Sequence, residues 1–158
     1  MAEIMRQIGI SAVGAAVYTR LTTSAYMTGY TTIVYNFVPE GTDMPYIRFG
    51  DFMDRRSAMF GSRDFAPEDI AFMVHVFSNY QGDKECGDIM SAVTKALTAT
   101  ALSITGYSTL YNCELDYSDI MIDDSEPGQP VRHGILRFLI RVCPVSYTHL
   151  TLPTIYSV

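Results

Sequence analysis

Two stretches near the start of the chain show hydrophobic residues that recur with different periods. Between residues 8 and 25 apolar side chains lie three or four positions apart, which predicts an amphipathic helix with one apolar stripe. Residues 31–38, "TTIVYNFV", are rich in β-branched and aromatic types and predict a strand that ends at Pro39. The stripe of the helix consists of Ile10, Val13, Val17 and Leu21.

A turn, a second strand and a loop follow. Two prolines, a glycine and an aspartate within residues 39–45 are typical of a chain reversal. Residues 46–53, "YIRFGDFM", alternate between two sides and predict a strand that pairs with the first one. Residues 54–68 follow neither period and contain three arginines, so we expect an exposed loop or a splayed hairpin end there.

The most apolar part of the chain, residues 70–77, predicts a central strand that is buried on both faces. His75 lies inside this strand. We interpret it as a hydrogen-bonded core or interface residue rather than a ligand, because no second histidine or carboxylate shares a motif with it. His133 stands near the start of the last strand, and the sequence shows no catalytic partner for it.

The C-terminal half alternates periods again. Residues 81–100 predict a second helix, with Asp83 in its first turn, where a negative charge suits the helix dipole. Residues 111–117 alternate as a strand, residues 123–130 form a polar turn, and residues 131–142 predict a last strand. The inward side of that last strand is expected to carry Leu136, Phe138, Ile140 and Val142, opposite Arg137 and Arg141.

The resulting order is helix, three strands, helix, two strands, which predicts an α+β fold. Short turns favour a mostly antiparallel sheet of about five strands, and two helices most economically cover one face of it. The other face then stays partly apolar, which suggests subunit contacts. A length of 158 residues suits one domain.

Composition narrows the possible functions. The chain carries a net charge of −6 and no Lys/Arg cluster, which argues against a surface that grips nucleic-acid phosphates, although like charge suits a channel through which DNA slides. Three cysteines without a CxxC pair indicate free thiols rather than a disulfide framework or a zinc site. The N-terminal apolar run is flanked by Arg6 and Arg20 and is too short for a membrane span.

We find no motif for a nucleophile, a phosphate loop or a metal, and therefore expect no catalytic site, no cofactor and no metal. The acidic run 116–126 lacks the glycine and terminal glutamate of a calcium loop, so a solvated hairpin tip or an acidic lining is favoured. The arginines of the 54–68 loop stand beside aspartates, which favours an exposed or intersubunit salt-bridge network over an anion site.

Three segments together resemble one family. "VYNFVPEGTDMPYIRFG" (34–50), "FMVHVFSNYQGDKECGDIMSAVTKAL" (72–97) and "RHGILRF" (132–138) are similar, in order and spacing, to the tail completion or tail terminator proteins of long-tailed bacteriophages. The resemblance runs from the first helix to about Arg141. Cys86 and Gly87 depart from it, because the family more often has small helix formers there.

The resemblance implies a structural virion protein without catalysis. Such a subunit forms a ring of its own copies, hexameric in form, on the last ring of the tail tube, where it stops tube growth and joins the head. Its partners would be itself, the tail-tube protein and the head–tail connector or neck protein. DNA would be only passing cargo, and no membrane would be involved. It would sit at the head-proximal end of the tail in the virion, after assembly in the cytoplasm of the host bacterium.

Two groups of charged residues are the candidates for these contacts. Subunit or end-face contacts are expected from Arg55, Arg56, Arg63 and Asp64, and from the 123–130 hairpin. A lumen-facing acidic lining is expected from Asp116, Asp119, Asp123, Asp124 and Glu126. Two other functions stay open: a neck or head-completion connector, and a small α+β ligand-binding or regulatory domain.

The end of the chain differs from the rest, because residues 144–158 contain no charged side chain. The segment "VSYTHLTLPT" resembles the translation of a transposase-type sequencing adapter. We therefore expect a natural domain of residues 1–143, followed by a non-native, disordered tail of residues 144–158.

Overall fold

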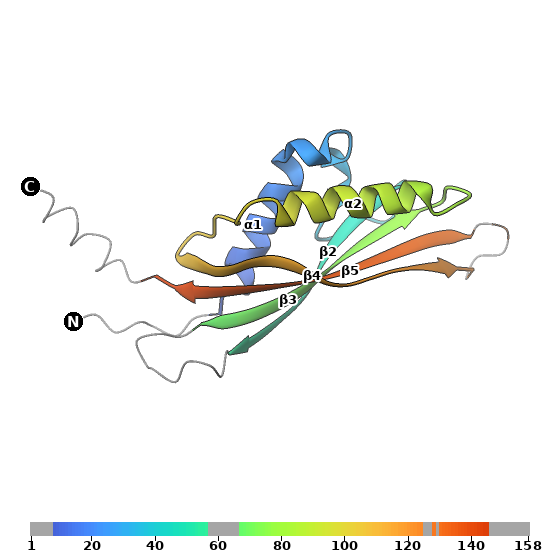
Figure 1. Ribbon diagram of the computed structural model, residues 1–158. Coiled ribbons are helices and arrows are strands. Elements are labelled where there is room, and N and C mark those ends of the chain that lie inside the picture. The colour runs from blue at the N-terminus through green and yellow to red at the C-terminus, as the bar shows by residue number, and fades with distance from the viewer. Residues whose placement is uncertain (1–7, 57–66, 125–127, 129, 146–158) are drawn as a thin grey trace, which may run out of the picture.

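The computed structural model describes residues 8–56, 67–124, 128 and 130–145. Five strands form one sheet in the order β1-β2-β3-β5-β4, and the two α-helices lie together on one side of it (Figure 1). This single α+β domain with a mostly antiparallel sheet confirms the predicted fold class. The elements are α1 (Ile10–Thr23), β1 (Val34–Tyr35), β2 (Tyr46–Arg56), β3 (Glu68–Ser78), α2 (Lys84–Thr98), β4 (Tyr107–Asp123) and β5 (Val131–Pro144), with short 3₁₀ turns at Ala25–Met27 and Thr31–Ile33.

The core lies between the helices and the sheet face beneath them. Of the predicted apolar stripe of α1, Val13, Val17 and Leu21 are buried and Ile10 is half-buried. One face of α2 is buried as well, including Ile89, Val93 and Leu97. Alternate residues of β3 and β5 meet these stripes, because side chains of a strand point to opposite faces in turn. Phe72 of β3 stacks between Phe52 and Phe138, with ring centroids 5.4 and 5.5 Å away. The inward-facing residues of the last strand are those that the alternation predicted.

Two polar contacts attach α1 to its surroundings. At the C-terminal end of α2, the Arg20 guanidinium donates to the carbonyl oxygens of Ala96 and Thr100, at 2.9 and 3.0 Å. The Ala96 carbonyl is one that a helix end leaves without an internal partner, and Thr100 lies just beyond that end. At the other end of α1, the Gly9 N–H donates to the carboxylate of Glu68 at 3.2 Å. Glu68 is only 8% exposed, so its charge lies in a poorly hydrated site.

The predicted first hairpin is wrong in two respects. Residues 31–33 form a 3₁₀ turn, so the strand expected over residues 31–38 shrinks to the two residues of β1. In addition, β1 pairs with β2 in parallel rather than antiparallel, with Val34 opposite Ile47. The connection after β1 carries the chain back before β2 begins, and Asn36 in it donates a side-chain N–H to the Phe49 carbonyl at 3.1 Å. Residue types show strand preference but not strand direction.

Two other boundaries and the burial of β3 differ from the sequence predictions. The expected 54–68 loop is shorter, because β2 continues to Arg56 and β3 begins at Glu68; residues 57–66 lie outside the described part. The acidic run is mostly strand rather than hairpin tip, because β4 extends to Asp123. β3 is central, as predicted, but Met73 and Phe77 on its second face are only half-buried, since both helices lie on the first face.

At the C-terminal boundary, β5 includes Pro144, and the Val145 N–H donates to the Gly106 carbonyl at 3.0 Å. The remainder of the expected tail, residues 146–158, lies outside the described residues. None of the described helices is long and apolar enough to cross a membrane.

Candidate subunit-contact surface

The face of the sheet that carries no helix is called the open face here. It is formed by alternate residues of β2 to β5, and the strand register brings them into rows across the sheet. One such row contains Tyr46, Phe77, His133 and Met121, and another contains Arg55, Asp69, Arg141 and Tyr111. The face is therefore a mixture of aromatic, aliphatic and charged side chains.

Three arginines of the open face are each next to a carboxylate. Arg48 lies 3.3 Å from Asp51, and Arg137 lies 3.6 Å from Asp116. Arg141 binds both carboxylate oxygens of Asp69, and its guanidinium also lies 5.2 Å from the centroid of the Tyr111 ring. The hydrogen bonds that Arg141 donates to Asp69 raise the pKa of its guanidinium above the usual value. At these three positions the paired charges leave little free positive charge for phosphate binding.

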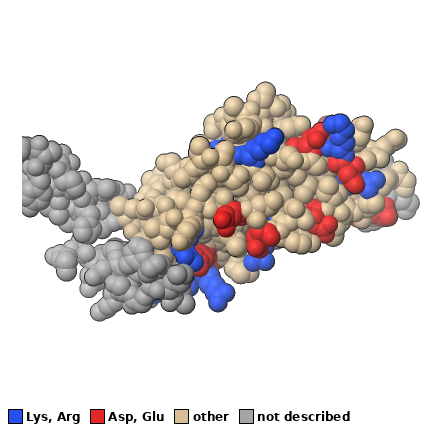
Figure 2. Space-filling view, viewed as in Figure 1, with Lys and Arg blue, Asp and Glu red and all other residues tan. Residues whose placement is uncertain are grey.

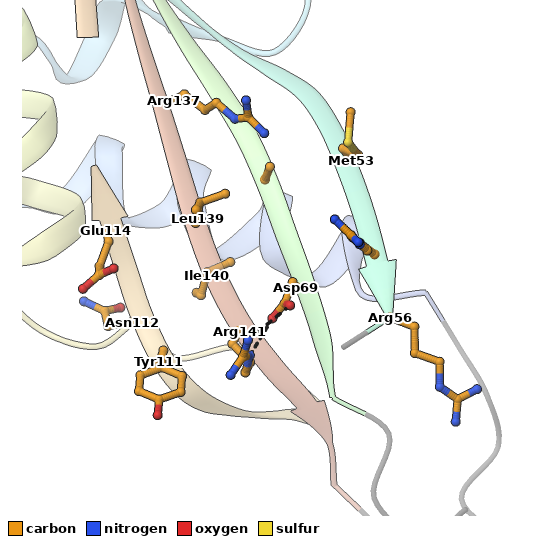
Figure 3. A pocket seen from close by; sticks show the side chains of 12 residues that line it. Met53, Arg56, Asp69, Tyr111, Asn112, Glu114, Arg137, Leu139, Ile140 and Arg141 are labelled. Carbon is orange, nitrogen blue, oxygen red and sulfur yellow. Dashed lines mark hydrogen bonds and ion pairs between the residues drawn. The ribbon is translucent and has the colours of Figure 1, made fainter. Parts of the chain in front are cut away.

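A hollow of about 730 Å³ opens on this face near the ends of β2 and β5 (Figure 3). Its apolar floor includes Met53, Ala71 and Leu139, and its rim carries the charged groups. Arg55 and Arg56, two of the predicted contact residues, line it and have no ion-pair partner among the described residues. The other two predicted contact residues, Arg63 and Asp64, lie outside the described residues.

Most of the predicted acidic lining lies on the open face. Asp119 and Asp123 belong to it by register, opposite Ile135 and Val131, and Asp116 reaches it through its contact with Arg137. Asp119 also accepts a hydrogen bond from the Tyr117 hydroxyl at 3.0 Å. Asp124 follows the end of β4 and is exposed, whereas Glu126 lies outside the described residues. Figure 2 shows acidic and basic groups interspersed on the visible side, and the basic groups do not gather into one continuous patch there.

β4 shows the strongest sign of a missing partner. It is one of the two edge strands of the sheet and, with 17 residues, the longest of the described strands. Large hydrophobic side chains on both of its faces are exposed, from 39% for Leu115 to 65% for Tyr111. Sequence alternation predicted the strand but could not show that it is an edge. The exposed hydrophobic residues of β4 are Tyr111, Leu115, Tyr117, Met121 and Ile122.

A small polar cluster lies on the open face beside the aromatic row. His75, only 7% exposed, contacts the His133 Nε2 through its Nδ1 at 2.8 Å and the Asp51 Oδ2 through its Nε2 at 2.9 Å. The interpretation of His75 as a hydrogen-bonded residue is confirmed. Its partners are 58 and 24 positions away in the chain, so no local motif could identify them.

The described residues offer little for catalysis. None of their histidine, cysteine, aspartate and glutamate side chains form a group of three or more that could hold a metal ion. All three cysteines are buried, and Cys86 and Cys113 are free thiols, as expected. Burial raises the pKa of the Cys113 thiol to about 12, which keeps it protonated and poorly reactive.

Comparisons with known proteins identify relatives of the fold and the family. Two solved structures share the fold: a chain in "Virion of native gene transfer agent (GTA) particle" and the chain in "Structure of bacteriophage SPP1 gp17 protein". The first is 21% identical with a TM-score of 0.70, over 85% of this chain and 97% of that one. The second is 20% identical with a TM-score of 0.55, over 86% and 90%.

A search of curated proteins finds no match to the sequence. The sequence model of the family described as "Tail completion protein gp17" matches residues 15–143, which is most of the chain and nearly all of the described domain. The chain therefore belongs to the tail completion protein gp17 family.

Proposed function

We propose that this chain assembles with copies of itself into a ring, hexameric as the family resemblance implies, that ends the phage tail tube and forms its joint with the head. Family membership supports a structural role in the tail. The observation that carries the proposal of self-assembly is the exposed edge strand β4, with hydrophobic side chains on both faces.

An edge strand of this kind needs a cover. Its unpaired backbone N–H and C=O groups and its exposed side chains would promote aggregation in a monomer, and proteins normally protect such edges. A neighbouring copy that covers β4 with a different part of its own surface makes a heterologous contact. Repeated with a fixed rotation, such contacts close into a ring.

The helices and the open face then take different places in the ring. We place the open face toward the channel, because Asp116, Asp119 and Asp123 lie on it and its arginines are largely paired. Negative and neutralised charge discourages binding of the DNA backbone, so DNA passes as cargo. Arg55 and Arg56, together with Arg63 and Asp64, are the proposed contacts at subunit boundaries or ring ends.

The ends of the ring account for termination. One end would resemble the joining surface of the tail tube and bind the tail-tube protein, while the other would present a different surface to the head–tail connector or neck protein. Growth stops because the second end offers no site for another tube ring. The protein would thus be located at the head-proximal end of the tail in the virion, after assembly in the host cytoplasm.

Substitution on β4 tests the proposal. We expect Ile122→Lys to prevent ring formation, because it adds a charge to the covered edge, and to leave the monomer folded, because Ile122 is 55% exposed. The matched control is Tyr80→Lys, at a side chain that is 53% exposed outside β4. Analytical ultracentrifugation should show a ring for the wild type and the control and a monomer for Ile122→Lys.

Two outcomes would contradict the proposal. A wild-type chain that stays monomeric, even with tail-tube protein present, excludes the ring, and an Ile122→Lys ring of unchanged size excludes β4 as the contact. A neck connector, one alternative, would bind the head side of the joint and would not bind tail-tube protein.

The hollow near Arg55 keeps a small ligand-binding domain as the second candidate. A monomer that binds a small anion saturably would support this candidate.

A further inference from the structure

Asp51 has an unusual backbone conformation that brings it into the polar cluster of the open face. Its φ of 54° lies in the left-handed region, which is rare for residues other than glycine, and it follows Gly50 where the pairing of β2 with β3 shifts register. Bulges of this kind change the direction of a side chain. Here the carboxylate contacts both His75 and Arg48, so a strained backbone positions one acid against a buried histidine.

The hydrogen bonds define where the protons sit. An ionised Asp51 only accepts, so the His75 Nε2 must carry its proton toward Asp51. In a neutral His75 ring the Nδ1 is then an acceptor, and the His133 Nε2 must donate to it. With both imidazoles neutral, each of the two contacts thus has one donor and one acceptor.

One added proton preserves this arrangement. It can bind the outer nitrogen of His133, or it can bind the His75 Nδ1 while His133 changes tautomer and accepts. A second proton cannot be accommodated in the same way. With both rings charged, each of the two facing nitrogens carries a proton at a separation of 2.8 Å, and two positive charges lie next to each other.

We propose that Asp51, His75 and His133 form a proton-sensitive clasp across β2, β3 and β5, which is closed with no or one added proton and opens when both histidines are protonated. Opening breaks the side-chain link between β3 and β5. It also disturbs the stack of His133 on Phe77, whose ring centroids are 4.4 Å apart. The clasp does not depend on ring formation.

The charges around the clasp come from β2 and β4. On β2, Arg48 and Asp51 face His75, and on β4, Asp123 faces His133 while Asp119 belongs to the row of His75. The helices lie on the opposite side of the sheet. Burial, followed by the charges of His75 and Arg48, lowers the pKa of His133, against the opposing effect of Asp123. The hydrogen bond from His75 lowers the pKa of Asp51, so this acid stays ionised.

Urea unfolding as a function of pH tests the clasp. His149, the third histidine of the chain, is replaced in all variants by His149→Gln, so that two imidazoles remain. Below about pH 6.5 the histidines of the unfolded chain bind protons more readily than those of the folded clasp. The free energy of unfolding therefore decreases as the pH falls. From about pH 7 to about pH 5, we expect the unfolding equilibrium constant to rise about tenfold more than in His133→Gln. The Gln side chain keeps the donor but does not titrate.

Nitrogen NMR of the wild-type imidazoles gives a second measurement that does not depend on a variant. We expect two coupled titration steps, with signals from Phe77 and Asp51 changing only in the second. Asp51→Asn keeps an acceptor, tolerates the left-handed backbone and should move both steps to lower pH. The proposal is wrong if wild type and His133→Gln show parallel pH curves, or if the two imidazoles titrate independently.

Discussion

At the scale of single residues, Glu68 shows how position changes the chemistry of a common side chain. Burial, followed by the nearby charge of Asp54, raises the pKa of Glu68 to about 7, although it accepts a hydrogen bond from Gly9. The Asp54 Oδ2 and the Tyr107 hydroxyl are buried without a hydrogen-bond partner among the described residues. A protonated Glu68 can donate to Asp54, so the proton takes the place of a countercharge.

This residue gives a stability prediction with a definite sign. Because the folded pKa is raised, stability is full below the unfolded value of about 4.5 and is lost as pH rises toward about 7. Glu68→Gln keeps an acceptor for Gly9 and removes the titration. Urea unfolding at pH 5 and pH 8 measures the free energy of unfolding of both proteins. We expect the difference in favour of Glu68→Gln to grow by about 1–3 kcal/mol from pH 5 to pH 8. An equal difference between the two proteins at both pH values would contradict the raised pKa.

At the scale of elements, the approach of α2 to the sheet depends on a glycine of β5. A Cβ atom at Gly134 would lie 2.5 Å from the Met90 sulfur and 2.8 Å from the Cys86 sulfur, both on α2. At Gly87, on α2 itself, a Cβ atom would meet nothing within 4 Å. The two glycines therefore have opposite roles: Gly134 permits close packing, and Gly87 only weakens its helix.

Alanine substitution should separate these roles. We expect Gly134→Ala to lower the free energy of unfolding by about 1–3 kcal/mol, because α2 must shift away from the sheet. We expect Gly87→Ala to raise it by up to about 1 kcal/mol through helix propensity. Chemical denaturation of both variants and the wild type measures these changes. An unchanged free energy of unfolding for Gly134→Ala would show that α2 does not pack closely against β5 at this position.

At the scale of the whole molecule, the open face is the surface with which the proposed ring meets DNA. Its acidic groups include Asp123 at the end of β4, next to the exposed Asp124. If these residues line the channel, replacing their charges with positive ones would hold the DNA backbone during passage. Folding should be unaffected, because both side chains are exposed.

We therefore expect the double variant Asp123→Lys and Asp124→Lys to assemble normally but to reduce DNA delivery. The measurement is infectivity of assembled particles against particle number, with circular dichroism as the control for folding. At low salt the variant should also bind DNA in vitro more tightly than the wild type does. Added salt should reduce this difference, because salt screens the attraction between charges. Unchanged infectivity of fully assembled particles would count against the channel-facing assignment.

The sequence by itself determined which residues face the core, because periods of two and 3.6 follow from local backbone geometry. It therefore predicted both helices, four of the five strands and the inward face of β5, and its ordered segments indicated the family. The charged contact residues were chosen by composition alone, and their proposed roles stay predictions.

Tertiary structure decided which strands are neighbours. It made β1 parallel, placed β4 at the edge, and brought His75, His133 and Asp51 together across β3, β5 and β2. Strand order and register arise from pairing between distant segments, which local periodicity does not encode. For this reason the exposed edge and the histidine clasp, on which the proposals of self-assembly and proton sensitivity rest, became visible only in the folded chain.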